Sequence, residues 1–149
     1  MHVPRDFLAA LTKAPPERVG EGWADNHVYI QSNLMEPAVA AAGMVAAAVA
    51  DPLVPLMWRR SLLLVLDCLC TGEQDGVAAA CLQAVRGCSW ALYEEIASGR
   101  SVSAAGYAFE LLSLMPEEKE RLKFFQERHW EDLPWDLHPG RMNLDAVDW

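Results

Sequence analysis

AVAAAGMVAAAVA, residues 38–50, is the stretch of sequence that decides the fold. Eight of its thirteen residues are alanine, the amino acid with the highest helix propensity. The small alanine side chain also lets a neighbouring helix approach closely. Asp51 and Pro52 follow directly, and proline cannot continue a helix. The stretch therefore predicts a helix that packs closely against at least one other helix.

Apolar residues recur at helical spacing through most of the remaining chain. The expected helices span residues 4–13, 34–50, 56–71, 75–97 and 101–114, with one more from Pro116 onward. Asn33 and Glu36 form a capping box ahead of the alanine-rich helix, and the helix over 75–97 is expected to bend near Gly87. No segment keeps the two-residue alternation of a strand. The pattern predicts an all-α protein of about five to six helices.

The length and composition predict one domain. The chain has 149 residues, of which 52 % are hydrophobic, and a mean hydropathy of +0.04, which is typical of a globular protein. We expect a single α-helical domain over residues 1–149. Beyond Trp130 the helical pattern ends, and residues 131–149 form an irregular acidic tail that contains tryptophan.

The charge of the chain favours a basic partner. Asp and Glu number 21 against 12 Lys and Arg, a formal net charge of −9, which disfavours nucleic acid and anionic membranes. The adjacent pair Arg59-Arg60 is expected to bond to Asp51, Asp67 or another nearby acid. No apolar run reaches the roughly 18 residues of a membrane span, and no secretory signal begins the chain. A cytoplasmic location is therefore expected.

Two segments share one layout, a helix ending in Val-Ala-Asp51 or Ile-Ala-Ser98, a short turn, and a second helix. The offset of 47 residues is typical of two-helix HEAT or armadillo units. We therefore expect a short HEAT-like or armadillo-like array of helical hairpins. The first and last helices would cover its ends.

The same layout resembles a known family. Residues 26–72, NHVYIQSNLMEPAVAAAGMVAAAVADPLVPLMWRRSLLLVLDCLCTG, and 81–118, CLQAVRGCSWALYEEIASGRSVSAAGYAFELLSLMPEE, are similar in helix pattern and turn placement to small HEAT-repeat-like proteins common in actinobacterial genomes. The resemblance implies a short α-solenoid that binds other proteins. Some members of the family look like immunity proteins for toxins. The resemblance implies no catalytic residues.

The residues that could carry metal or catalytic chemistry lack the spacing it needs. Cys68 and Cys70 point in different directions on a helix, Cys81 and Cys88 lie on an apolar stripe, and the four histidines share no helix at ligand spacing. No nucleotide-binding, serine-hydrolase or zinc-protease motif occurs. We expect no metal, no cofactor and no catalytic residue. The alternative is a small enzyme or ligand-binding protein with a pocket between helices, lined by Trp23, Tyr29, Trp90 and Tyr107.

The C-terminal segment is the candidate for partner binding. Aromatic anchors among carboxylates suit a protein that docks into a basic cleft. The predicted partner-binding residues are Trp130, Glu131, Asp132, Trp135 and Asp136, together with Glu94 and Glu95, which are expected to be solvated. The competing interpretation is that the tryptophans fold back over the last helix. The function expected from these residues is that of a protein-binding module, an immunity protein that neutralises a toxin with a basic cleft.

Overall fold

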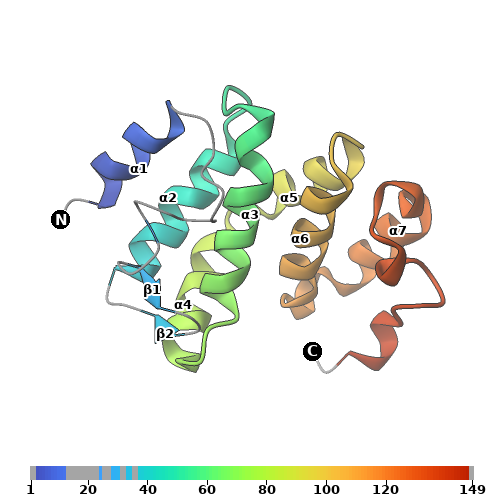
Figure 1. Cartoon of the computed structure of the whole chain (residues 1–149). Helices are drawn as coiled ribbons and strands as arrows, with labels where there is room; N and C mark the ends of the chain where they lie inside the picture. Colours follow the sequence, from blue (N-terminus) through green and yellow to red (C-terminus); the bar gives the residue numbers. More distant parts are fainter. Residues whose placement is uncertain (1–2, 13–23, 25–27, 31–32, 35–36, 148–149) are drawn as a thin grey trace. The chain divides into compact units, whose positions relative to one another are not determined.

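The computed structural model describes residues 3–12, 24, 28–30, 33–34 and 37–147, and these residues form an all-α fold (Figure 1). This confirms the predicted fold class. The α-helices within the described ranges are α1 (Val3–Leu11), α2 (Ala38–Ala50), α3 (Leu56–Cys70), α4 (Asp75–Arg86), α5 (Ser89–Ala97), α6 (Val102–Ser113) and α7 (Lys119–Arg128). None of these helices is long and apolar enough to cross a membrane.

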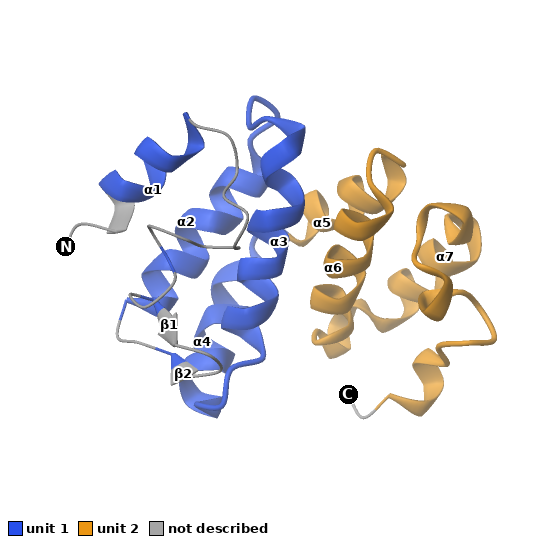
Figure 2. Ribbon diagram, in the orientation of Figure 1, with its two compact units in different colours: residues 1–88 blue, residues 89–149 orange. Residues whose placement is uncertain are grey.

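The chain divides into two compact units, residues 1–88 and 89–149 (Figure 2), where the sequence predicted one domain. The boundary lies where the helix expected over 75–97 is broken into α4 and α5. The expected bend near Gly87 is thus a complete interruption. Glycine has a low helix propensity, and the Cys88 N–H turns back to the Val85 carbonyl at 2.9 Å. This turn ends α4.

In the first unit, α2 packs against both α3 and α4. The residues on the buried face of α2 are mostly alanine, and the buried residues of α3 include large side chains such as Trp58 and Leu62. Small residues facing large ones let helices approach closely while filling the space between them. Val39 lies outside this face and is exposed, although it continues the same apolar pattern in the sequence.

The start of α2 differs from the prediction. The helix begins at Ala38 after Pro37, and Asn33 lies in β2 (Asn33–Leu34), which pairs with β1 (Tyr29–Ile30) in a short antiparallel ladder. The Leu34 N–H donates to Oε1 of Gln74 at 2.6 Å. The capping-box prediction is wrong, because the residue that caps α2 is Pro37, with no side-chain cap hydrogen bond, and Asn33 belongs to a strand.

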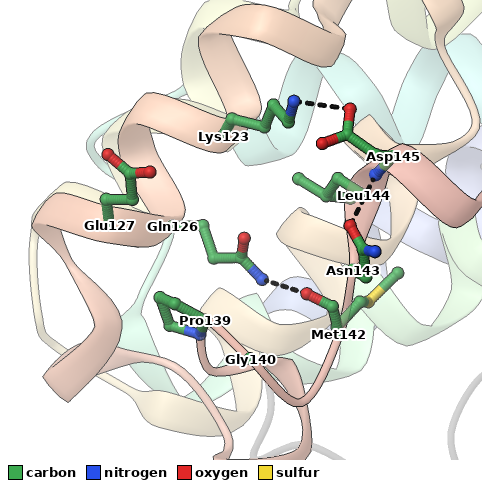
Figure 3. A pocket seen from close by; sticks show the side chains of 9 residues that line it. All are labelled: Lys123, Gln126, Glu127, Pro139, Gly140, Met142, Asn143, Leu144 and Asp145. Carbon is green, nitrogen blue, oxygen red and sulfur yellow. Dashed lines mark hydrogen bonds and ion pairs between the residues drawn. The ribbon is translucent and has the colours of Figure 1, made fainter.

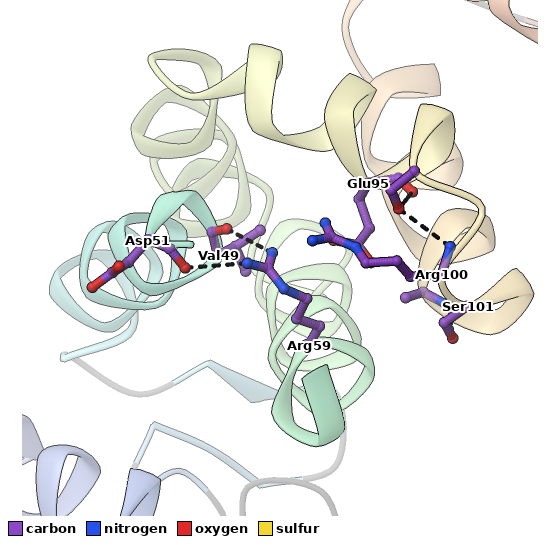
Figure 4. Close-up of polar contacts among 8 residues, drawn as sticks. Val49, Asp51, Arg59, Glu95, Arg100 and Ser101 are labelled. Atoms are coloured by element: carbon purple, nitrogen blue, oxygen red, sulfur yellow. Dashed lines mark hydrogen bonds and ion pairs between the residues drawn. The ribbon is translucent and has the colours of Figure 1, made fainter. Parts of the chain in front are cut away.

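The carboxyl end of α2 is capped by an arginine. Arg59 of α3 is almost fully buried, and its two terminal nitrogens donate to the carbonyl oxygens of Val49 and Asp51 at 3.0 and 3.1 Å (Figure 4). These carbonyls belong to the helix end, where a cation is also favoured by the helix dipole. Asp51 was among the partners predicted for Arg59, and this contact is made through its backbone oxygen.

In the second unit, α5 pairs with α6, and α7 packs against both of them. Tyr93 of α5 joins these elements: its ring lies 4.5 Å from that of Phe125 and 4.0 Å from the guanidinium carbon of Arg121. Its hydroxyl donates to the Glu118 carboxylate at 2.9 Å. Burial, together with Glu118, raises the pKa of Tyr93. The tyrosine therefore remains a neutral hydrogen-bond donor.

The helix pairs α2–α3 and α5–α6, which the internal repeat predicted, are both present and in contact. The addition of α4 to the first pair makes that unit more than a simple hairpin. The HEAT-like arrangement itself stays a prediction, as does the family resemblance.

Candidate partner-binding surface

The C-terminal tail, residues 129–147, is folded onto the second unit. Its backbone makes three short 3-10 turns, η2 (Trp130–Asp132), η3 (Trp135–Leu137) and η4 (Leu144–Ala146). Three leucines between and within these turns are buried: Leu133, Leu137 and Leu144. The sequence left open whether this segment is docked or loose, and in the structure it is docked.

Gln126 of α7 fixes the middle of the tail. Its side chain is only 5 % exposed, and Nε2 donates to the carbonyl oxygens of Leu137 and Met142 at 2.8 and 3.1 Å. Sequence reasoning missed this residue, since a polar side chain on α7 is ordinarily solvated. The available signal was its position one turn after Leu122, which is buried on the same helix face.

Two glycines let the tail approach the α5–α6 pair. A Cβ atom at Gly106 of α6 would lie 2.7 Å from Cγ of Pro134. At Gly99, in the turn between α5 and α6, it would lie 2.9 Å from Oδ1 of Asp132, and the backbone there has a positive φ of 60°. Pro134 and Asp132 therefore pack where only glycine leaves room.

The tail leaves two tryptophans on the surface. Trp130 is 45 % exposed and Trp135 62 % exposed. The rings of Trp130 and His138 are nearly perpendicular, with centroids 5.3 Å apart, and the guanidinium carbon of Arg141 lies 3.4 Å from the centroid of Trp135. These contacts hold the rings without burying them. The interpretation that Trp130 and Trp135 are buried over the last helix therefore does not hold, while Trp149 lies outside the described residues.

The acidic residues of the tail differ in their surroundings. Glu131 and Asp136 are exposed. Asp132 is half-buried against Gly99, and its Oδ2 lies 3.6 Å from Nδ1 of His129. By sequence, residues 89–149 hold twelve acids and six Lys or Arg, so most of the negative charge of the chain belongs to this unit. Glu131 and Asp136 are therefore available to a partner, whereas Asp132 also supports the fold.

Glu94 and Glu95 are adjacent in sequence but occupy opposite environments. Glu94 is exposed. Glu95 is fully buried, and its Oε2 accepts a hydrogen bond from Nη2 of Arg100 at 3.0 Å (Figure 4). The expectation of a solvated Glu95 was based on its place near a helix end, and the ion pair with Arg100 explains why the residue is inside instead. Glu95 is not part of a surface that a partner can reach.

A pocket of about 340 Å³ lies between α7 and the last part of the tail (Figure 3). Lys123 and Asp145 form an ion pair across its edge, with 2.5 Å between Nζ and Oδ1. The residues that line the pocket are Lys123, Gln126, Glu127, Pro139, Gly140, Met142, Asn143, Leu144 and Asp145. This pocket does not include the aromatic residues of the alternative prediction. Trp90 is exposed, and Trp23 lies outside the described residues.

The cysteines occupy apolar surroundings. Cys70 and Cys81 are buried, and Cys68 and Cys88 are half-buried. Burial raises the pKa of all four thiols, that of Cys70 to about 12. Within the described part of the chain, no three His, Cys, Asp or Glu residues are grouped so as to hold a metal ion. These thiols therefore remain protonated at neutral pH and act as small apolar side chains.

Comparison of the chain with protein-family models, with curated proteins and with solved structures finds no match. The candidate surface therefore rests on the geometry described above.

Proposed function

We propose that this protein binds a basic protein partner through the surface formed by Trp130, Glu131, Trp135 and Asp136. The observation that supports this most directly is the exposure of two tryptophans, 45 % and 62 %, on a segment whose backbone is anchored. Large aromatic side chains are usually buried, and exposed apolar groups ringed by polar ones are typical of interaction sites.

The two kinds of residue have different roles in this proposal. Tryptophan is enriched among the residues that contribute most to binding energy, because burying it removes a large apolar area from water. Exposed carboxylates contribute little affinity but speed the encounter with a positively charged partner. The net charge of −9 extends this attraction beyond the contact surface.

We further propose that the partner is a toxin and that the chain is its immunity protein. A toxin that acts on nucleic acid or nucleotides needs a positively charged active cleft, and an acidic protein can occupy or cover such a cleft. The proposal also draws on the resemblance to HEAT-repeat-like immunity proteins. It predicts that the chain inhibits the activity of the partner in stoichiometric amounts.

Binding kinetics of the whole chain test the proposal. The partner is recovered with the wild-type protein from the source cells, and the product of the adjacent reading frame is tried first. We expect Trp135→Ala to raise the dissociation rate by about thirtyfold, the effect of losing roughly 2 kcal/mol. Neutralising Glu131 and Asp136 together is expected to slow association and to flatten its dependence on salt.

Matched controls separate this surface from a general effect. Trp90→Ala removes another exposed tryptophan of the same unit, outside the tail, and is expected to leave both rates unchanged. If Trp135→Ala and the doubly neutralised variant stay folded and bind like the wild type, the proposed surface is wrong.

A small-ligand function is the second candidate, and the pocket beside α7 is the observation in its favour. Its volume of about 340 Å³ falls at the small end of the range of ligand sites.

A further inference from the structure

We infer that the pocket between α7 and the tail binds the guanidinium group of an arginine side chain. The source that we assign to this group is the basic partner, so this part of the inference rests on the proposed function. Three features of the pocket support a guanidinium whatever its source: the acceptor Oε1 of Gln126, the carboxylate of Glu127 and the apolar walls.

The acceptor in the pocket is Oε1 of Gln126, a residue that is only 5 % exposed. The side-chain nitrogen of Gln126 donates to two backbone carbonyls. If the amide were flipped, its oxygen would face these two carbonyl oxygens, and no hydrogen bond could form. The amide orientation is therefore fixed. Oε1 points into the pocket (Figure 3), and no described residue donates a hydrogen bond to it. A ligand that satisfies this acceptor must bring an N–H or O–H donor.

The edge of the pocket offers a carboxylate to a cation. Asp145 is shared by Lys123 and Lys119, whose Nζ atoms lie 2.5 and 3.6 Å from its Oδ1. Glu127, which also lines the pocket, has no ion pair among the described residues. A cationic donor gains a charge-assisted hydrogen bond from this carboxylate, whereas an anionic ligand would be repelled by it.

The walls suit a long side chain with a charged end. Pro139, Met142 and Leu144 supply apolar atoms along the pocket, and the methylene stem of an arginine packs well on such surfaces. Gln126 and Glu127 each line the pocket and offer an acceptor, and a guanidinium carries, in a planar fork, several N–H groups that can donate to them. A lysine ammonium is more strongly hydrated and lacks this planar fork.

The first experiment uses the full chain without any partner. N-acetyl-L-arginine amide is titrated into ¹⁵N-labelled protein, and the amide signals of the Gln126 side chain, Gly140 and Asn143 are followed by NMR. We expect these signals to shift in a saturable way, with an affinity in the millimolar range for so small a ligand. The citrulline derivative has nearly the same shape but no charge, and it should bind about tenfold more weakly.

A pair of charge variants locates the site. Glu127→Gln is expected to weaken binding of the arginine probe about two- to fivefold, the usual range for an exposed ion pair. Glu120→Gln makes the same change in net charge on the same helix, but Glu120 does not line the pocket, so the affinity should stay as in the wild type. Both positions are exposed, and neither variant should disturb the fold.

The outcomes are separable from those of the proposed function. Absence of saturable shifts, or equal binding of the arginine and citrulline probes, would overturn the guanidinium site whatever the partner assays give. If the probe binds but an excess of it does not slow association with the partner, the assignment to an arginine of the partner is wrong. Competition that needs about two- to fivefold more probe in Glu127→Gln than in the wild type would support the full inference.

Discussion

The close approach of the tail to α6 at Gly106 makes a quantitative prediction. Replacing Gly106 by alanine in a helix interior should stabilise the helix by about 1 kcal/mol. The new Cβ atom, however, would lie 2.7 Å from Cγ of Pro134 and 3.3 Å from its Cδ, much closer than carbon atoms pack. Such overpacking costs about 1 to 3 kcal/mol. We expect Gly106→Ala to lower the free energy of unfolding by up to about 2 kcal/mol as the two terms combine.

A double-mutant cycle separates the two terms. Pro134→Ala removes both proline atoms that the new Cβ would meet, so in that background Gly106→Ala should show only the helix gain and stabilise the protein by about 1 kcal/mol. The coupling energy between the two positions is therefore expected to be about 1 to 3 kcal/mol. Urea denaturation followed by circular dichroism gives the four free energies, and an unchanged m-value shows that the midpoints are comparable.

Gly87→Ala is the control, since nothing lies within 4 Å of a Cβ atom at Gly87 and its φ is −62°. It should be neutral or slightly stabilising. If Gly106→Ala stabilises the wild type and the Pro134→Ala variant equally, the tail does not pack on α6 as described, and the reasoning fails.

Two further predictions concern other parts of the fold. Gly99→Ala should lower the free energy of unfolding by about 1 to 2 kcal/mol, because the backbone has φ 60° and a Cβ atom would meet Asp132. Urea denaturation measures this change. A decrease below about 0.5 kcal/mol, the usual limit for a neutral surface substitution, would contradict the prediction. Burial raises the pKa of Cys70 from 9.0 to about 12, so the folded state retains a proton that the unfolded state loses. Stability is then complete below pH 9 and falls as the pH rises toward 12, by about 1.4 kcal/mol per pH unit for this group. The free energy of unfolding of Cys70→Ala, measured by urea denaturation, should fall less steeply between pH 9 and 12 than that of the wild type. Parallel plots of this free energy against pH for the two proteins would refute the raised pKa of Cys70.

The sequence predicted the helices well because the signals that set them are local. The alanine-rich residues 38–50 form α2, and the helix ends where the sequence predicted, since alanine-rich composition and the following proline act within the segment itself. The same holds for Ser101, whose hydroxyl accepts from the Ala104 N–H at 3.3 Å at the start of α6. The break between α4 and α5 was harder to predict, since a single glycine costs only about 1 kcal/mol in a helix.

The candidate site was predicted only in part, because its geometry depends on contacts between distant residues. The spacing of Trp130 and Trp135 drew attention to the tail, but their exposure follows from how Gln126 and the buried leucines dock the backbone. Glu95 shows the opposite case. Its burial depends on Arg100, and nothing in a pair of adjacent glutamates distinguishes the buried one from the solvated one.

The way in which Gln126 anchors the tail has a consequence for how this surface can vary. Its two hydrogen bonds reach main-chain oxygens, which every amino acid provides, and the buried leucines supply the rest of the attachment. The exposed positions 130, 131, 135 and 136 therefore contribute little to holding the segment in place. Substitutions there can change which partner is recognised while the segment stays attached, so recognition and folding can diverge independently in related chains.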